Sequence, residues 1–260
     1  MDLHLEGKLA LVTGSTAGIG YAIVESLARE RCRVIVNGRT QARVDAALGK
    51  LANADAVGLA ADLGTSNGCA EAIRRFPQVD ILINNMGIFE PKAFEDISDD
   101  DWLRFFEVNV LSGVRLSRHY LPRMKATGWG RIVFISSESG VQIPAEMIHY
   151  GVTKTAQLAV SRGLAEATAG TGVTVNAVLP GPTASEGAEE FVGRMAAERG
   201  TSRAAIEQEF FRNIRPSSLL RRFATTQEVA DLVTFVASPL SAAIDGAALR
   251  VDGGVVRSII

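Results

Sequence analysis

The chain has 260 residues, of which 47% are hydrophobic and 22% charged, a composition that excludes a disordered or collagen-like protein. Its 27 basic and 29 acidic residues leave a formal charge of −2, which argues against nucleic acid or an anionic membrane as a partner. The two cysteines, Cys32 and Cys69, are too few for a disulfide framework or a zinc cluster, so we expect a reducing, cytoplasmic setting and no metal site. We also expect no signal peptide and no membrane span, because no apolar run approaches about 18 residues.

Short apolar runs alternate with longer stretches of helical pattern. The expected strands are 9–13, 34–36, 56–59, 79–83, 131–135, 173–178 and 248–251. The expected helices are 18–30, 41–52, 99–124, 149–169 and 226–237. Continuous apolar strands that alternate with helices form a parallel sheet covered on both faces. The pattern therefore predicts a single α/β domain over residues 1–260, built on a doubly wound parallel sheet (a Rossmann fold), with ligands beyond the carboxyl ends of the strands.

Residues 182–222 break this rhythm, because they are polar, rich in Glu and Arg, prone to helix and without a strand signal. An insert of this length in a compact domain is typical of a lid over a binding site. A solvated pair of helices is an equally good interpretation.

A glycine-rich segment follows the first strand, with Gly14, Gly18 and Gly20 in a G-x-x-x-G-x-G spacing. Such glycines allow a tight turn, a close approach of backbone to a pyrophosphate, and close packing of helix on strand. The helix that follows offers unpaired N–H groups to an anion. A plain turn between strand and helix is the alternative, and this segment alone predicts only a nucleotide-type ligand.

The end of the second strand reads Val36-Asn37-Gly38-Arg39-Thr40, without the acid that would bind the ribose 2′-hydroxyl of NAD. The Arg39 guanidinium could bind a 2′-phosphate, so we expect NADP in preference to NAD, unless Arg39 is a solvated surface arginine. After the third strand, Asp62 and the backbone of Leu63 could bind the adenine edge, although Asp is also a common turn or capping residue.

Tyr150 and Lys154 are four residues apart on an expected helix, which places them on one face. A lysine ammonium beside a phenol favours the phenolate, so we expect a lowered Tyr150 pKa and a role as general acid or base. Ser137 follows the fifth strand, where its hydroxyl could donate to a substrate oxygen. Either feature alone is also explained as a chance helical pair or a turn residue.

Together these motifs resemble the short-chain dehydrogenase/reductase family, in its compact branch. The resemblance covers essentially the whole chain, from Thr13 to Gly254. It is carried by Thr-Gly-x-x-x-Gly-Ile-Gly at 13–20, Asn84-Asn85-x-Gly87, Asn109, Ser137, Tyr150-x-x-x-Lys154 and Pro180-Gly181.

The resemblance implies a catalytic tetrad of Asn109, Ser137, Tyr150 and Lys154. Tyr150 would exchange the proton, and Ser137 would orient the substrate oxygen. Lys154 would hold the nicotinamide ribose and acidify Tyr150, and Asn109 would hold a water that links Lys154 to solvent. The residues expected to bind the cofactor are Gly14, Ser15, Thr16, Gly18, Ile19, Gly20, Arg39, Asp62, Leu63, Asn85, Gly87, Tyr150, Lys154, Pro180, Gly181, Thr183 and Ser185.

Two positions depart from the family pattern. Met86 stands where Asn-Asn-Ala-Gly has its alanine, so it either crowds the nicotinamide side, reshapes the substrate pocket or fills a gap with its thioether. Ser185 stands where family members often have the threonine that binds the nicotinamide carboxamide, and Thr183 could make the same bond.

The resemblance implies an NAD(P)-dependent oxidoreductase that moves a hydride between the nicotinamide and a carbonyl or secondary alcohol. A catalytically silent NAD(P) sensor on the same fold is the alternative, and a Rossmann methyltransferase would leave Tyr150, Lys154 and Ser137 without a task. We expect the substrate, a small molecule, to contact Ser137, Met86, Glu138, Gln142 and Met147, a set that leaves its polarity open.

The family usually forms homotetramers or homodimers, and the apolar tail 255–260 is costly to expose. The tail would pack on a neighbouring subunit or on its own.

Overall fold

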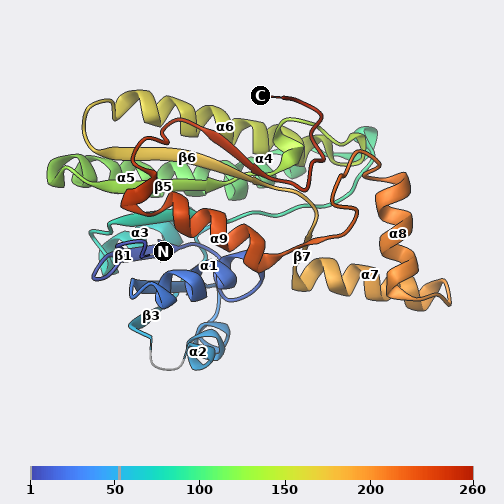
Figure 1. Ribbon diagram of the computed structural model, residues 1–260, viewed down its shortest axis with the longest axis horizontal. Helices are drawn as coiled ribbons and strands as arrows, with labels where there is room; N and C mark the ends of the chain where they lie inside the picture. The colour runs from blue at the N-terminus through green and yellow to red at the C-terminus, as the bar shows by residue number, and fades with distance from the viewer. Residues whose placement is uncertain (1, 52–53, 260) are drawn as a thin grey trace.

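The computed structural model describes residues 2–51 and 54–259, whose strands form a central parallel sheet in the order β3-β2-β1-β4-β5-β6-β9 (Figure 1). These strands are β1 (Leu9–Val12), β2 (Arg33–Gly38), β3 (Ala56–Ala60), β4 (Ile81–Asn84), β5 (Gly130–Ile135), β6 (Val173–Pro180) and β9 (Ala248–Val251). The order reverses between β1 and β4, which confirms the doubly wound α/β sheet. The carboxyl ends of β1, β4, β5 and β6 therefore meet at one edge.

The helices of the described residues mostly follow the predicted ones. They are α1 (Gly18–Arg29), α2 (Gln41–Lys50), α3 (Ser66–Arg75), α4 (Asp99–Phe106), α5 (Ser112–Thr127), α6 (Ile148–Ala167), α7 (Glu186–Glu198), α8 (Arg203–Asn213) and α9 (Thr226–Val236). The predicted end of α2 at residue 52 lies outside the described residues. We did not predict α3, although Cys69, Ala72, Ile73 and Phe76 follow a helical apolar spacing and pack in one core cluster.

The predicted helix over 99–124 is interrupted. A π-helical segment, Glu107–Leu111, separates α4 from α5, and Asn109 lies in its middle. Such wide turns leave little trace in an apolar pattern, and they are frequent at functional sites.

The sheet is covered on both faces by two apolar clusters. Ala10 and Val12 of β1 pack with residues of α1 and α9, whereas Leu11 packs with residues of α3, α5 and α6. Figure 1 shows α6 on one side of β6 and α9 on the other. This alternation along one short strand is what buries both faces of a parallel sheet.

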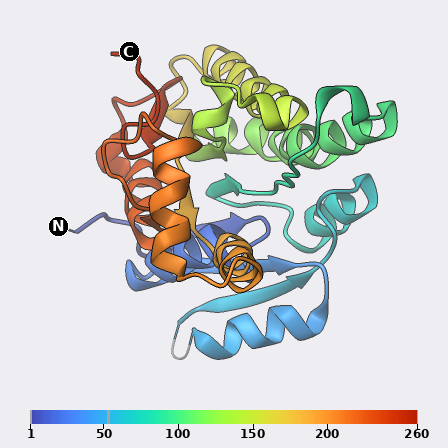
Figure 2. The same ribbon diagram turned by 90° about the vertical axis from the view of Figure 1, so that its right-hand side faces the viewer.

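The insert over residues 182–222 folds as α7 and α8 and stands at the end of the molecule where β6 leads into it (Figures 1 and 2). A small apolar cluster that includes Val192, Ala196 and Ile206 joins the two helices. The expectation of no strand in this insert is wrong, because Thr183–Ala184 (β7) pairs in parallel with Ala224–Thr225 (β8). A strand of two residues is too short to show an alternating apolar pattern, and the two strands of this pair are far apart in the sequence.

The C-terminal tail divides between burial and exposure. Val255 and Val256 are buried in their own chain, whereas Ile259 is exposed, and Ile260 lies outside the described residues. The tail thus packs on its own subunit in its first half.

Cys32 and Cys69 are both buried and free. A search of the described residues finds no helix with the length and apolarity that a membrane span needs.

One buried histidine has no hydrogen-bonding partner. His149, in α6, is 0% exposed, and neither of its ring nitrogens has a partner among the described residues. Its ring packs 4.0 Å from the ring of Phe105. Burial lowers the pKa of His149, because it penalises the charged imidazolium.

This histidine makes stability depend on pH. Because the folded-state pKa lies below the unfolded value, the unfolded chain takes up the proton first, and stability falls as pH drops through about 6.5. We expect His149→Phe to lose less stability than the unmodified chain between pH 7 and pH 5, by about 1–2 kcal/mol. Urea denaturation of both proteins at the two pH values measures this, and equal losses would contradict the assignment.

Candidate functional site

The phosphate loop between β1 and α1 has a backbone that requires its glycines. Gly14 and Gly18 have φ of 61° and 57°, values that favour glycine. A Cβ on Gly20 would lie 2.5 Å from the side-chain nitrogen of Asn85 and 2.5 Å from the carbonyl oxygen of Gly14. The third glycine therefore allows the close packing of helix and loop that its spacing predicts.

The N-terminus of α1 suits an anion. Its cap residue, Ala17, offers no side-chain hydrogen bond, and the first turn contains no acid. The helices α5, α6 and α7 also lack a side-chain cap, whereas α2, α3, α4, α8 and α9 each begin with a Ser or Thr side chain that accepts a backbone N–H. The leading N–H groups of α1 are thus left without a side-chain cap, as a pyrophosphate site requires.

Asn37, at the end of β2, holds the loop in place. Its Oδ1 accepts from the N–H of Gly14 at 2.9 Å, and its Nδ2 donates to the carbonyls of Leu59 and Ala61 at 3.1 and 3.0 Å. Ser15 completes the link, because its Oγ accepts from the N–H of Asn37 at 2.9 Å. Asn37 therefore ties three strand ends together, a role that sequence reasoning missed.

Other predicted loop residues are packing residues. A Cβ on Gly38 would lie 2.5 Å from Cγ2 of Thr16, and Ile19 packs against the core. The Ser15 hydroxyl is also occupied, since it donates to the carbonyl of Val12 at 2.7 Å. Within this loop, the backbone is therefore left for a ligand, together with the Thr16 hydroxyl, which forms no hydrogen bond with the described residues.

The segment after β4 braces the same loop. The N–H groups of Asn85 and Met86 donate to Oγ1 of Thr13 at 2.8 and 3.0 Å, and Nδ2 of Asn85 donates to the carbonyl of Thr13 at 2.9 Å. Met86 packs against the core, with its sulfur 3.2 Å from where a Cβ on Gly14 would lie. The thioether thus fills the space beside the loop.

Arg39 and Asp62 lie at the surface on this edge. Arg39 is exposed, and no described residue forms a hydrogen bond or ion pair with its guanidinium. One carboxylate oxygen of Asp62 accepts from the N–H of Gly64 at 3.0 Å, as in a turn. Leu63 is fully buried in the core, so only its backbone is left for a ligand.

Asn109 and Lys154 are connected through Gln157. Nζ of Lys154 donates to the carbonyl of Ile135 at 2.9 Å and to Oε1 of Gln157 at 3.3 Å. Nε2 of Gln157 donates to the carbonyl of Asn109 at 2.5 Å. Gln157 lies three residues after Lys154, a helical spacing that could have flagged it.

The Asn109 side chain is fully used by protein groups. Its Oδ1 accepts from the N–H of Ile88 at 2.7 Å, and its Nδ2 donates to the carbonyl of Ile88 at 3.0 Å and to Oγ1 of Thr153 at 2.9 Å. It therefore joins the π-helical segment, the loop after β4 and α6. A Cβ on Gly87 would lie 3.3 Å from Nζ of Lys154, so this loop also passes directly over the amine.

The structure overturns the predicted pKa of Tyr150. Burial raises that pKa above its usual range, the Ser137 hydroxyl acts against this, and the Glu138 charge raises it further. Burial also lowers the pKa of Lys154 to about 7. Nζ of Lys154 lies 5.6 Å from the Tyr150 ring centre and donates to the carbonyl of Ile135, so it does not offset the desolvation of the phenol.

The residues predicted to contact the substrate differ in their burial and in their contacts with Ser137. Its Oγ donates to Oε2 of Glu138 at 2.5 Å. Gln142 is exposed and Met147 half-buried, both in the loop that leads into α6. The exposed ring of Phe89 packs edge-on against Tyr150, with ring centres 6.3 Å apart. The site therefore combines an apolar rim with a buried carboxylate.

The segment after β6 reaches the phosphate loop. Cβ of Ser185 lies 3.5 Å from where a Cβ on Gly18 would be, and Oγ1 of Thr183 donates to the carbonyl of Gly181 at 2.9 Å. Gly181, which follows Pro180, packs against backbone, since its Cβ would lie 2.5 Å from the carbonyl oxygen of Asp252.

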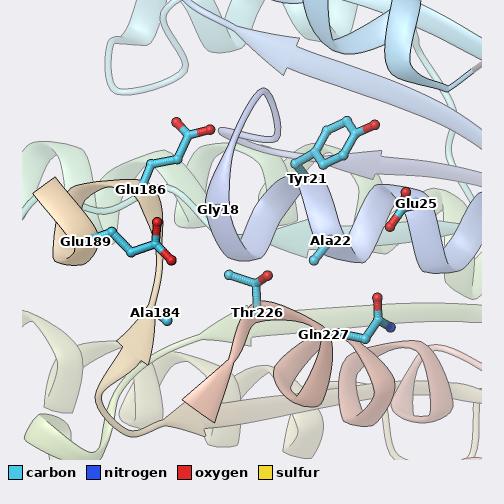
Figure 3. A pocket seen from close by; sticks show the side chains of 9 residues that line it. All are labelled: Gly18, Tyr21, Ala22, Glu25, Ala184, Glu186, Glu189, Thr226 and Gln227. Carbon is cyan, nitrogen blue, oxygen red and sulfur yellow. The ribbon is translucent and has the colours of Figure 1, made fainter. Parts of the chain in front are cut away.

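A cavity of about 260 Å³ lies on the α1 side of this loop, between α1, α7 and α9 (Figure 3). Carboxyl groups of Glu25, Glu186 and Glu189 line it. A pyrophosphate would be repelled there, and of the predicted site residues only Gly18 borders it. The cavity therefore lies apart from the tetrad.

Comparison with known proteins identifies the family. A family model described as short chain dehydrogenase matches residues 8–195. An uncharacterized oxidoreductase of Bacillus subtilis, YvaG, is 49% identical, with 100% of both chains covered. The 3-oxoacyl-[acyl-carrier-protein] reductase FabG of Aquifex aeolicus is 32% identical over 98% of this chain and 100% of the relative. A crystal structure of L-sorbose reductase from Gluconobacter frateurii, complexed with NADPH and L-sorbose, has a TM-score of 0.94 at 28% identity and covers 100% of both chains. The chain therefore belongs to the short-chain dehydrogenase/reductase family of NAD(P)-dependent oxidoreductases.

Proposed function

We propose that this chain interconverts a carbonyl and a secondary alcohol, with Tyr150 as the general acid or base. The observation that carries the proposal is the convergence of Tyr150, Ser137 and Lys154 at the edge where parallel strands end. The alternative of a silent sensor has no feature in its favour, because all four tetrad side chains are present.

A dinucleotide held at this edge would supply the hydride chemistry at the substrate carbon. In the reductive direction, the Tyr150 hydroxyl donates its proton to the carbonyl oxygen as that oxygen gains charge. The Ser137 hydroxyl, whose proton goes to Glu138 in the structure, orients the same oxygen once it turns toward the substrate. In the oxidative direction, Tyr150 accepts the proton from the alcohol.

Lys154 has two tasks in this proposal. Two of its three possible N–H donors are used by Ile135 and Gln157, and the third is left to bind the nicotinamide ribose. Its ammonium form also stabilises a phenolate at Tyr150 once the phenol has given up its proton. Asn109 supports both residues from the π-helical segment.

We assign the remaining cofactor contacts to groups whose hydrogen-bonding capacity is not used within the protein. Backbone of Gly14 to Gly20 and the start of α1 would hold the pyrophosphate, with Gly87 beside the nicotinamide. Ser185 is favoured over Thr183 for the carboxamide, since the Thr183 hydroxyl already donates to Gly181. Arg39 would hold a 2′-phosphate, which favours NADP.

We propose further that residues 1–260 form one dinucleotide-binding domain, with the insert at 182–222 as its substrate lid. A cytoplasmic location fits two free, buried cysteines. A homotetramer or homodimer fits the exposure of the apolar Leu219 and Ile259.

Tyr150→Phe tests the general acid. We expect kcat to fall by about 10²- to 10⁴-fold, because only the hydroxyl is lost, while NADPH binding persists. Turnover of a panel of ketones followed at the NADPH absorbance, with fluorescence titration of NADPH, measures both. Tyr120→Phe is the matched control, since the Tyr120 hydroxyl donates to the carbonyl of Phe76 in the core. Near-normal turnover by Tyr150→Phe would end the assignment.

Arg39→Ala tests the cofactor preference. We expect the Kd of NADPH to rise about tenfold to a hundredfold and that of NADH to change little, because only NADPH has the 2′-phosphate. Arg33→Ala, at the other end of the same strand, is the control. Equal weakening of both dinucleotides would refute this role for Arg39.

A further inference from the structure

A buried pair of opposite charges lies directly beside Ser137. Nε of Arg215 is 3.2 Å from Oε1 of Glu138, and the two side chains are only 11% and 6% exposed. The other carboxylate oxygen, Oε2, accepts from Oγ of Ser137 at 2.5 Å and from the N–H of Ser139 at 2.9 Å. Both oxygens of Glu138 are therefore engaged, one by the serine and one by the arginine.

These contacts leave the Ser137 hydroxyl little freedom. A hydroxyl has one proton and two lone pairs. The proton is given to Glu138, and one lone pair accepts from the N–H of Ser139 at 3.1 Å. The position of Oγ is thus fixed by Glu138 and by the backbone of the same turn.

Arg215 comes from a distant part of the chain. It lies in the insert, two residues after α8, and its NH1 also donates to Oε1 of Glu146 at 3.1 Å. Its guanidinium lies 6.0 Å from the ring centre of Phe210 in α8. Arg215 therefore joins the insert to the serine loop. The insert is also joined to the C-terminal segment, where the Ser217 hydroxyl donates to the carbonyl of Val255 at 2.6 Å, and at its base through β7 and β8.

A second ion pair of the insert is much more exposed to solvent. Arg199 and Glu209 link α7 to α8 within the insert, and their side chains are 50% and 45% exposed. Water and salt screen such a pair, so it adds little. A pair as buried as Arg215 and Glu138 is screened far less.

We propose that Glu138 and Arg215 are positioning residues: Glu138 fixes the position of the Ser137 oxygen, and Arg215 of the insert holds Glu138. The inference rests on the proposed role of Ser137.

A double-mutant cycle on kcat tests the coupling. We expect Glu138→Gln and Arg215→Met each to lower kcat about tenfold to a hundredfold, the range of one hydrogen bond to a charged group. Because both act through one contact, the double variant should be no more than about threefold slower than the slower single variant. The Kd for NADPH should stay unchanged in the two single variants and in the double variant. Arg199→Met is the control, with an effect below about fivefold.

Hydrogen exchange by mass spectrometry gives a readout that needs no turnover. Arg215→Met should speed exchange both in the insert and in residues 136–142, whereas Arg199→Met should speed it only in the insert. The inference would be overturned if the effects of the two single substitutions on kcat multiplied in the double variant. Unchanged exchange in residues 136–142 with Arg215→Met would also overturn it. Absence of turnover in the unmodified chain would instead refute the proposed function, and the exchange result would still decide the coupling.

Discussion

The buried amine of Lys154 is the constraint around which the candidate site is arranged. Its hydrogen bonds to Ile135 and Gln157 join the end of β5 to α6 and, through Gln157, to the carbonyl of Asn109 in the π-helical segment. A charged amine in this place is costly, which is why burial lowers its pKa to about 7. Burial therefore weakens the preference of Lys154 for its charged form, and its hydrogen bonds to Ile135 and Gln157 act against this cost.

The polar groups that surround this amine are held by backbone as much as by one another. Thr13, Asn37 and Asn85 use their side chains to satisfy the loops at the carboxyl edge of the sheet. These loops carry no regular hydrogen-bonding pattern of their own, so each buried N–H or carbonyl needs such a partner. What remains for a ligand is mostly backbone at the phosphate loop, together with a few side chains whose hydrogen bonds are not all used.

Much of the fold could be predicted from the sequence, because the strands are buried on both faces and their apolar runs are continuous. The role of Gly20 could be predicted too, since its spacing after a strand implies close packing. The π-helical turn at Asn109 and the pairing of β7 with β8 could not, because neither of them produces an apolar period. The helical spacing of Gln157 from Lys154 was a usable signal, whereas Arg215 acts through a contact that only the folded chain creates. The pKa of Tyr150 was wrongly predicted because desolvation, unlike the spacing of charges, cannot be judged from sequence.

A crystal structure of the chain with NADP⁺ bound tests the central claim most directly. The account predicts the nicotinamide ribose within hydrogen-bond distance of Nζ of Lys154, and the Tyr150 hydroxyl facing the same space as the nicotinamide ring. A dinucleotide bound away from Lys154 would contradict this proposal. So would a Tyr150 hydroxyl that points away from the bound dinucleotide.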